Sequence, residues 1–544
     1  MQFIPRSLMS VLALTMLIGL NAVSAQAQKI YVDSGRKMDG PVDGSSAHPY
    51  PTLASAVAAA PDGSTLVLQG CNYGDPATVG YPETGLLPLI AKKNLKLTAQ
   101  LGAAQIGRPL GTQRLWQLTG EWDMERGVST PSQTASRFGV RGTDLGSSFE
   151  HKGRIYFLFG DTWPSFFFDP FDLRPINSDS IAWIHGDTDP EQPEQLQLNF
   201  ITADDGKYLP PAVKVSENPN KYIDLKDYEV PLSGFSANGQ MYVFFSTDHY
   251  KAQVPCGDNL IEVDSMGRSV LARLKDLQKT DGMFTYLYDA SCRPGVTCQQ
   301  PAVGKFINIA SVVAQDDKFH DLLQEMNMGE GALLWGSGEF HESNPYLAFV
   351  PLDKIEDRSA WKFAIPDGNG NVSWSNNESD AKELFYQPCF CHCQIGELGV
   401  TPVHYLDEKG NKKVKWLMLY SHGDPLGLGQ GTRIHYRVAD KPWGPWGEMS
   451  YILFDPAYDL GYCHFMHVKE DEKHKCVSVA DDIPDSDSNR WGITYGPYPV
   501  SSFTKTDATT ATIYWTMSTA NPYQVMLMKS TLRLSDWRRV DHPR

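Results

Sequence analysis

Carboxylic side chains within two residues of glycines recur in this sequence, and their type suits acid–base chemistry on a sugar bond. Asp144 lies in the segment GTDLG, Asp161 in FGDTW and Glu397 in IGELG. The apolar neighbours of Glu397 require its carboxylate either to be paired or to face a channel, where partial burial raises its pKa. Glycosidic hydrolysis needs one carboxyl group that protonates the leaving oxygen and a second that attacks the anomeric carbon or activates water. We expect that pair among these three residues.

Two further acids are weaker catalytic candidates. Asp248 lies in the polar end of the run MYVFFSTDH, and Glu339 lies in GSGEFHESNPY, where glycines allow close approach of a ligand. For any single acid the alternative is structural, because Asp in a glycine-rich turn accepts hydrogen bonds from backbone amides. The recurrence of acids at the ends of similar runs favours a site.

Aromatic and amide side chains near the same run ends are candidates for binding substrate. Aromatic rings stack on the apolar faces of sugars, although an aromatic residue inside a sheet more often serves packing. The predicted substrate-binding residues are Trp163, Trp335, His422, Asn521 and Tyr523.

Nine cysteines are first interpreted as disulfides, with Cys292–Cys298 and Cys463–Cys476 as the close pairs. The segment CFCHC (389–393) raises the alternative of a thiolate metal site, but its spacing by two is not that of a zinc knuckle. The segment DDIPDSD (481–487) offers clustered oxygens for calcium, and a solvated turn is the alternative. The sequence predicts no cofactor and no metal.

A repeat of short, aromatic-rich runs indicates which elements carry these groups. The runs are IYFLFGDTW (155–163), MYVFFSTDH (241–249), LLWGSGEF (333–340), KWLMLYSHG (415–423) and IYWTMSTAN (513–521), and their starts lie 82 to 98 residues apart. This period and composition predict an all-β fold, a five-bladed propeller of four-stranded sheets. If the runs are the innermost strands, their polar ends gather at one mouth of the central channel.

The remaining composition limits the class of protein. Residues 1–27 show one basic residue, an apolar stretch and Ala25-Gln26-Ala27, which predicts a secretory signal and a periplasmic or secreted protein. No later segment is long and apolar enough to span a bilayer. The net charge of −16 argues against nucleic acid as a main partner.

The chain divides into two predicted parts after the signal. Residues 28–112 resemble the opening of a right-handed parallel β-helix, with an Ala-rich helix (52–60) between strands, and we expect a truncated coil docked on the propeller. Residues 113–544 form the propeller. The segment 318–329 (KFHDLLQEMNMG) predicts a helix, inserted at the surface between blades.

A set of motifs from about 115 to 540 resembles one bacterial family. The motifs are GTDLG, FGDTW, WGSGEF, NPYLA, IGELG, RVADKPWGPW, YGPY and TMSTANPYQVMLMK. They are similar to those of a bacterial propeller family long catalogued as a domain of unknown function, some of whose members are endo-D-arabinanases. The resemblance implies a shape like that of five-bladed arabinanases and invertases, and a set of inner acids drawn from Asp144, Asp161 and Glu397.

The leading hypothesis is therefore an exported glycoside hydrolase that acts within a furanoside polysaccharide, with D-arabinan of the arabinogalactan or lipoarabinomannan type as the first substrate. Asp161 is assigned as nucleophile or base, Glu397 as general acid and Asp144 as their partner. A non-catalytic carbohydrate-binding propeller is the second hypothesis, and a polysaccharide lyase is the third. Polysaccharide is the expected partner, and no oligomeric state is predicted.

Overall fold

The protein forms two compact units, Met1–Arg108 and Pro109–Arg544, and each is described by itself. The computed structural model describes residues 28–33, 42–45, 48–69, 93, 95–99, 111–165, 177–215, 221–226, 228–256, 259–279, 283–338, 341–387, 394–407, 409–423, 432–447, 451–456, 464–467 and 493–537. The predicted signal peptide, Glu339, the segment CFCHC, the pair Cys463–Cys476 and the segment DDIPDSD lie outside these residues.

The first unit contains a parallel sheet and one short helix. Its elements are β1 (Lys29–Asp33), α2 (Leu53–Ala59), β2 (Thr65–Gln69) and β3 (Lys96–Ala99), with the strands in the order β1-β2-β3. Thr52 caps α2, because its hydroxyl accepts the Ser55 N–H at 3.2 Å. Ile30 and Val32 of β1 and Leu66 of β2 pack with the apolar face of α2 in one small core. That these strands are rungs of a β-helix, docked on the propeller, stays a prediction.

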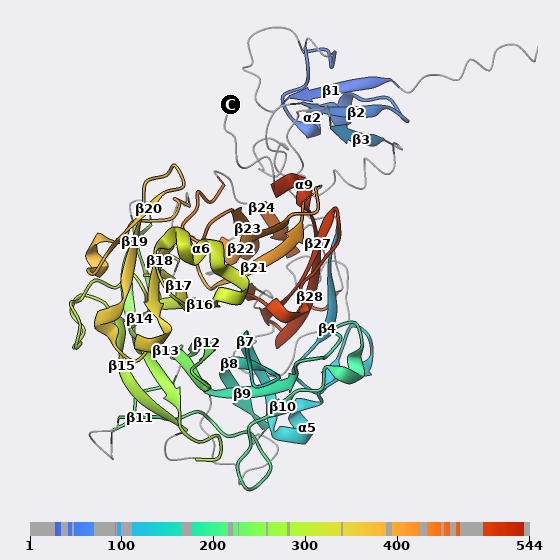
Figure 1. The fold of residues 1–544 in the computed structure, drawn as a ribbon. Coiled ribbons are helices and arrows are strands. Elements are labelled where there is room, and N and C mark those ends of the chain that lie inside the picture. Colours follow the sequence, from blue (N-terminus) through green and yellow to red (C-terminus); the bar gives the residue numbers. More distant parts are fainter. Residues whose placement is uncertain are drawn as a thin grey trace, which may run out of the picture. The chain divides into compact units, whose positions relative to one another are not determined.

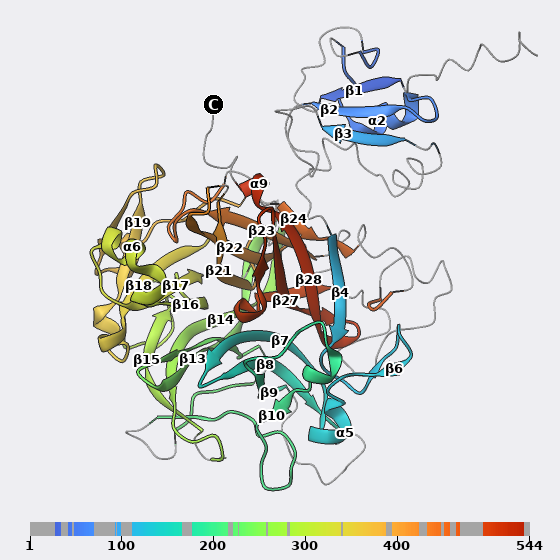
Figure 2. The ribbon, with the colours of Figure 1, turned by 45° about the vertical axis from the view of Figure 1, so that its right-hand side comes forward.

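The second unit is a five-bladed β-propeller, so the predicted fold class is confirmed (Figures 1 and 2). Blade 1 contains β7 (Val140–His151), β8 (Arg154–Pro164), β9 (Ser178–His185) and β10 (Asn199–Phe200). Blade 2 contains β12 (Pro231–Ala237), β13 (Gln240–Cys256), β14 (Asn259–Leu274), β15 (Phe284–Cys292) and β11 (Val213–Lys214). Blade 3 contains β16 (Asn308–Ala314), β17 (Gly331–Ser337), β18 (Tyr346–Pro351), β19 (Lys362–Pro366) and β20 (Val372–Ser375).

The last two blades complete the ring. Blade 4 contains β21 (Leu398–Leu406), β22 (Lys412–Gly423), β23 (Thr432–Ala439) and β24 (Tyr451–Phe454). Blade 5 contains β25 (Thr494–Pro499), β27 (Thr510–Ala520), β28 (Tyr523–Arg533) and β4 (Gly111–Gln117), with β26 (Lys505–Thr506) paired to β27. Strand β4 precedes blade 1 in the chain but pairs with β28 of blade 5. The last blade therefore takes its outermost strand from the start of the propeller sequence, and this pairing closes the ring. The predicted domain boundary at 112/113 falls inside β4.

Short elements fill the connections between strands. They are the hairpin β5 (Trp122–Asp123) and β6 (Val128–Ser129), the helices α5 (Thr134–Phe138), α6 (Asp316–Met326) and α9 (Leu534–Trp537), and the 3₁₀ turns η2 (Pro193–Gln195), η3 (Leu352–Lys354), η4 (Arg358–Ala360), η5 (Glu378–Asp380) and η6 (Ser501–Phe503). Among the described residues no helix is long and apolar enough to cross a membrane.

The aromatic-rich runs form the second strand of each blade, so the condition that they are the innermost strands is not met. The innermost strands are β7, β12, β16, β21 and β25, because each is an edge strand of its sheet and contacts its counterparts in the two neighbouring blades. The runs lie in β8, β13, β17, β22 and β27, which have a paired strand on both sides. This double pairing, with a neighbouring blade on each face, explains their apolar composition.

The cores lie between neighbouring blades, and α6 contributes to one of them. Phe319 of α6 stacks on Trp416 of blade 4 with ring centroids 5.5 Å apart. Leu323 and Met326 are buried in the same cluster, which joins blades 3 and 4. The helix connects β16 to β17, so the predicted helix exists but lies inside blade 3 rather than between blades.

Candidate active site

Three acids of blade 1 lie at one end of its sheet because neighbouring strands run in opposite directions. Asp144 lies near the start of β7, Asp161 near the end of β8 and Asp179 at the start of β9. The end of the sheet where they meet is the one at which the innermost strand begins. Glu397 directly precedes β21, the innermost strand of blade 4, and therefore lies at the start of an innermost strand as well.

Strand β8 has a β-bulge at Asp161 relative to both of its neighbouring strands, β7 and β9. Between the pairs Phe159–Ser180 and Thr162–Ser178, two residues of β8 face the single residue Asp179 of β9. The register with β7 also shifts here. The backbone of Asp161 has φ 25°, a left-handed conformation that non-glycine residues rarely adopt. Bulges of this kind redirect a side chain and are frequent next to active sites.

The carboxylate of Asp144 is buried against blade 5. Its Oδ2 accepts hydrogen bonds from the hydroxyls of Tyr523 at 2.7 Å and Tyr495 at 3.0 Å. Its Oδ1 has no hydrogen-bond partner among the described residues. Gly160, opposite Asp144 in the ladder, leaves room for this group, because a Cβ there would lie 2.8 Å from Oδ1.

Burial controls the protonation of Asp144. Loss of solvent raises its pKa, the two tyrosine hydroxyls oppose this, and the negative charge of Glu397 raises it further, to about 6. The interaction with Glu397 shows that acids from blades 1 and 4 share one electrostatic environment. Asp144 therefore changes its charge near neutral pH.

Glu397 is a buried acid with two donors. It accepts a hydrogen bond from Ser421 Oγ at 2.6 Å and a longer one from the Gly496 N–H at 3.4 Å. Burial raises the pKa of Glu397, and these hydrogen bonds only partly oppose the effect. A carboxyl group with a raised pKa retains its proton at a pH where it can donate that proton to a leaving group.

Two acids and one tyrosine were missed by the sequence analysis. Asp179 is fully buried, and neither carboxylate oxygen has a hydrogen-bond partner among the described residues. Burial raises its pKa well above the usual range, and the charges of Asp161, Asp144 and Glu229 add to the shift. Burial raises the pKa of Tyr495, and the negative charges of Asp144, Glu397 and Asp161 raise it further. These couplings tie the blade 1 acids to Glu397.

The sequence contains only a weak signal for the missed residues. Asp179 stands between two serines directly before the apolar run IAWI, so a buried acid at the start of a strand was open to recognition. Glu229 is buried before β12 and accepts backbone N–H groups from Lys226 at 3.0 Å and His249 at 2.8 Å. It directly precedes the apolar segment 230–232, and that position is the one local signal of its burial.

The predicted substrate-binding residues differ in their surroundings. Trp163 and Tyr523 are buried against each other, and Tyr523 contacts Asp144 directly. His422 lies beside His435, with ring centroids 4.7 Å apart, and Asn521 is buried, with its backbone carbonyl accepting the His467 N–H at 2.9 Å. Tyr523 is thereby hydrogen-bonded to one of the clustered acids.

Trp335 was wrongly predicted to contact substrate. It is fully buried in the core between blades 3 and 4, where its ring lies 5.3 Å from that of Trp416. Its Nε1 donates a hydrogen bond to the Pro442 carbonyl at 3.1 Å. The side chain has no surface left for a sugar.

We expect Trp335→Phe to lower the free energy of unfolding by roughly 2 kcal/mol, because it leaves a small cavity and removes one of the two indole hydrogen bonds that the buried Pro442 carbonyl accepts. Chemical denaturation measures this loss. Since no catalytic group is touched, KM for any substrate should stay unchanged. A raised KM at unchanged stability would contradict the burial of this residue.

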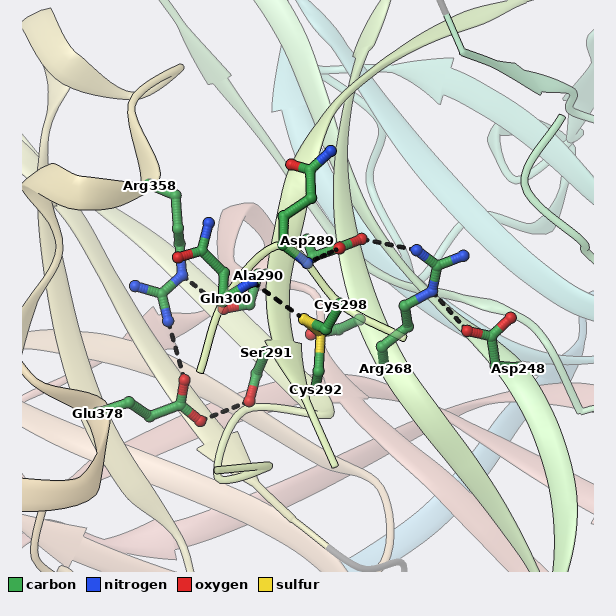
Figure 3. The surroundings of a disulfide bond; sticks show 12 residues. Asp248, Arg268, Asp289, Ala290, Ser291, Cys292, Cys298, Gln300, Arg358 and Glu378 are labelled. Carbon is green, nitrogen blue, oxygen red and sulfur yellow. Dashed lines mark hydrogen bonds and ion pairs between the residues drawn. A yellow bond between two sulfur atoms is a disulfide. The ribbon is translucent and has the colours of Figure 1, made fainter. Parts of the chain in front are cut away.

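Asp248 is an ion-paired acid at the rim of blade 2. Figure 3 shows Arg268 between Asp248 and Asp289, with Arg268 Nε 2.6 Å from Asp248 and Nη1 2.8 Å from Asp289. Asp289 in turn lies close to the disulfide Cys292–Cys298. The presence of this disulfide confirms one of the two predicted cysteine pairs. Asp289 and these two cysteines also form the one group of three possible metal ligands among the described residues, but both sulfurs belong to the disulfide. With Arg268 neutralising it, Asp248 is a poorer catalytic candidate than Asp144, Asp161 and Glu397.

Comparison with solved structures finds weak similarity to several enzymes. An endo-arabinase from Bacteroides thetaiotaomicron is 10% identical, over 72% of this chain and 94% of that one, with a TM-score of 0.28. A glycosyl hydrolase from Bacteroides ovatus is 9% identical, over 77% and 93%, with a TM-score of 0.35. A family 117 glycoside hydrolase from Zobellia galactanivorans is 10% identical, over 78% and 91%, with a TM-score of 0.30.

Comparison of sequences adds one family. No curated protein matches the chain. Residues 305–529, from just before β16 to within β28, match a family model described as a domain of unknown function (DUF4185). The motifs GTDLG and FGDTW of blade 1 lie outside this segment.

Proposed function

We propose that this protein is a glycoside hydrolase that cleaves within a furanoside polysaccharide. The observation that carries the proposal is the convergence of Asp144, Asp161 and Glu397 from two blades at one end of the propeller, with the pKa of two of them raised by burial. Isolated structural acids are paired with cations or left in water, whereas paired carboxyls with separated proton affinities are what glycosidic cleavage requires.

The chemistry divides between the two blades. Glu397, protonated, donates its proton to the glycosidic oxygen as the bond from that oxygen to the anomeric carbon breaks. Asp161 is the most exposed of the three acids, and its Oδ1 accepts a backbone N–H at 3.2 Å. It either forms the new bond to the anomeric carbon or takes the proton of the water that does. Asp144 holds negative charge between them.

For the substrate we propose D-arabinan of the arabinogalactan or lipoarabinomannan type, on the strength of the motif resemblance. We also propose export to the periplasm or the medium, because the first 27 residues have the pattern of a secretory signal. The exported protein would then bind its polysaccharide substrate outside the cytoplasm.

Incubation with soluble arabinogalactan, followed by chromatography of the products, tests the proposal. Release of oligosaccharides with new reducing ends is expected. Cleavage of L-arabinan or fructan with D-arabinan left intact would overturn the substrate and keep the reaction class. Binding of polysaccharide without any new reducing ends would replace the enzyme by a carbohydrate-binding propeller, and products that absorb in the ultraviolet would indicate a lyase.

A further inference from the structure

An exposed tyrosine lies directly beside Asp161. Tyr228 precedes β12, the innermost strand of blade 2, and its backbone N–H donates to Asp161 Oδ1 at 3.2 Å. Although it adjoins buried acids, 46% of its surface is exposed. An open aromatic ring next to a carboxylate is an unusual arrangement for a packing residue.

The ring of Tyr228 is held in place by a contact on one of its faces. It stacks on the His249 imidazole, with centroids 5.0 Å apart and an interplanar angle of 29°. His249 is itself fixed, because its Nε2 lies 2.8 Å from Asp264 and its backbone N–H donates to Glu229. The exposed part of the tyrosine therefore lies away from the imidazole and is presented in one orientation.

The backbone of Tyr228 is strained to reach this position. Its φ of 64° lies in the left-handed region, which bulky residues avoid. Such conformations persist where the surroundings enforce them, and they concentrate at ligand-binding sites. One residue thus supplies both a backbone N–H to Asp161 and an exposed side chain whose ring stacks on His249.

We propose that Tyr228, supported by His249, is the stacking platform for a sugar ring of the polysaccharide at a subsite adjoining Asp161. The ligand class follows from the chemistry: a flat, rigid aromatic surface matches the apolar face of a sugar, and the neighbouring carboxylates accept hydrogen bonds from its hydroxyl groups. This inference rests on the proposed function, whose reaction it supplies with a substrate contact.

The test is native affinity electrophoresis through gels that contain soluble arabinogalactan, with every variant made in a Glu397→Gln background so that the polymer stays intact. Tyr228→Ala should weaken retardation with a roughly tenfold rise in Kd, the size expected for loss of one aromatic contact. Tyr228→Phe should bind like the parent, because the ring is kept. Tyr228→Leu keeps bulk without the ring and should behave like the alanine variant, which separates stacking from folding.

Tyr222→Ala is the matched control. Tyr222 is comparably exposed, with 42% of its surface accessible, but its ring lies against Lys214. Its replacement by alanine should leave binding unchanged. Equal Kd for Tyr228→Ala, Tyr228→Leu and the parent would overturn the platform even if the wild type hydrolyses arabinogalactan. Loss of binding in these variants, with a wild type that never cleaves, would keep the platform and overturn the enzyme. A wild type that is not retarded by the polymer overturns the platform as proposed.

Discussion

Glu397→Gln is expected to slow hydrolysis of the polysaccharide by about 10²–10⁴-fold, the range over which a general acid contributes. Glutamine keeps an oxygen that accepts the Ser421 hydroxyl, so the local hydrogen bond and the fold should persist. What is lost is the proton that the leaving oxygen needs. Initial rates of reducing-end release, with thermal unfolding measured in parallel, give the effect.

The leaving group decides whether Glu397 acts as the acid. An aryl furanoside with an acidic phenol leaves without help from a proton, so the same variant should lose far less activity on it than on the polymer. Because burial raises the pKa of Glu397, wild-type activity should fall as the pH rises through a value above the usual carboxyl range. The residual activity of the variant should lack that fall.

A second glutamate provides the control for these measurements. Glu383→Gln removes an exposed acid near Tyr346 and should leave both rates unchanged. If Glu397→Gln lost activity equally on both substrates, together with thermal stability, the role of Glu397 would be structural.

The repeat in the sequence predicts the number of blades but not the order of strands within a blade. Aromatic-rich runs mark the strands that are covered on all sides, and in a blade these are the second strands. Innermost strands converge on the propeller axis and need small residues instead. Gly399 in β21 illustrates this, because a Cβ there would lie 2.5 Å from Pro499 in the neighbouring blade.

The site could be predicted only where the local sequence reflects it. Asp144, Asp161 and Glu397 lie within two residues of glycines, which the close approach of strands requires, and Tyr495 experiences the charge of all three. Asp179 escaped notice because the groups that raise its pKa belong to other strands or to another blade. The prediction that Trp335 binds substrate was wrong for the opposite reason. Its local sequence is rich in aromatic residues, but these residues belong to a core between blades.

Asp144→Asn is expected to stabilise the protein at pH 7 while it removes most of the activity. The carboxyl pKa rises from 3.8 in the unfolded chain to about 6 in the folded protein, a difference equivalent to roughly 3 kcal/mol. A raised pKa means that the folded state disfavours the ionised form. The penalty is therefore absent below pH 3.8, grows as the pH rises to about 6, and is constant above that value.

Asparagine is neutral at every pH and keeps an oxygen that accepts from Tyr495 and Tyr523, so it should relieve this penalty. Denaturant unfolding of both proteins from pH 3.5 to 8 should show curves that coincide at the acid end and diverge toward neutrality. Asp507→Asn is a control of opposite sign, because hydrogen bonds from Thr509 and Thr510 lower the pKa of Asp507 to about 2. Its carboxylate stabilises the fold above pH 3.8, so that variant should lose stability at pH 7. A destabilised Asp144→Asn at pH 7 would mean that the two tyrosines hold the ionised carboxylate more strongly than burial disfavours it, and that Asp144 enters the reaction as a fixed negative charge.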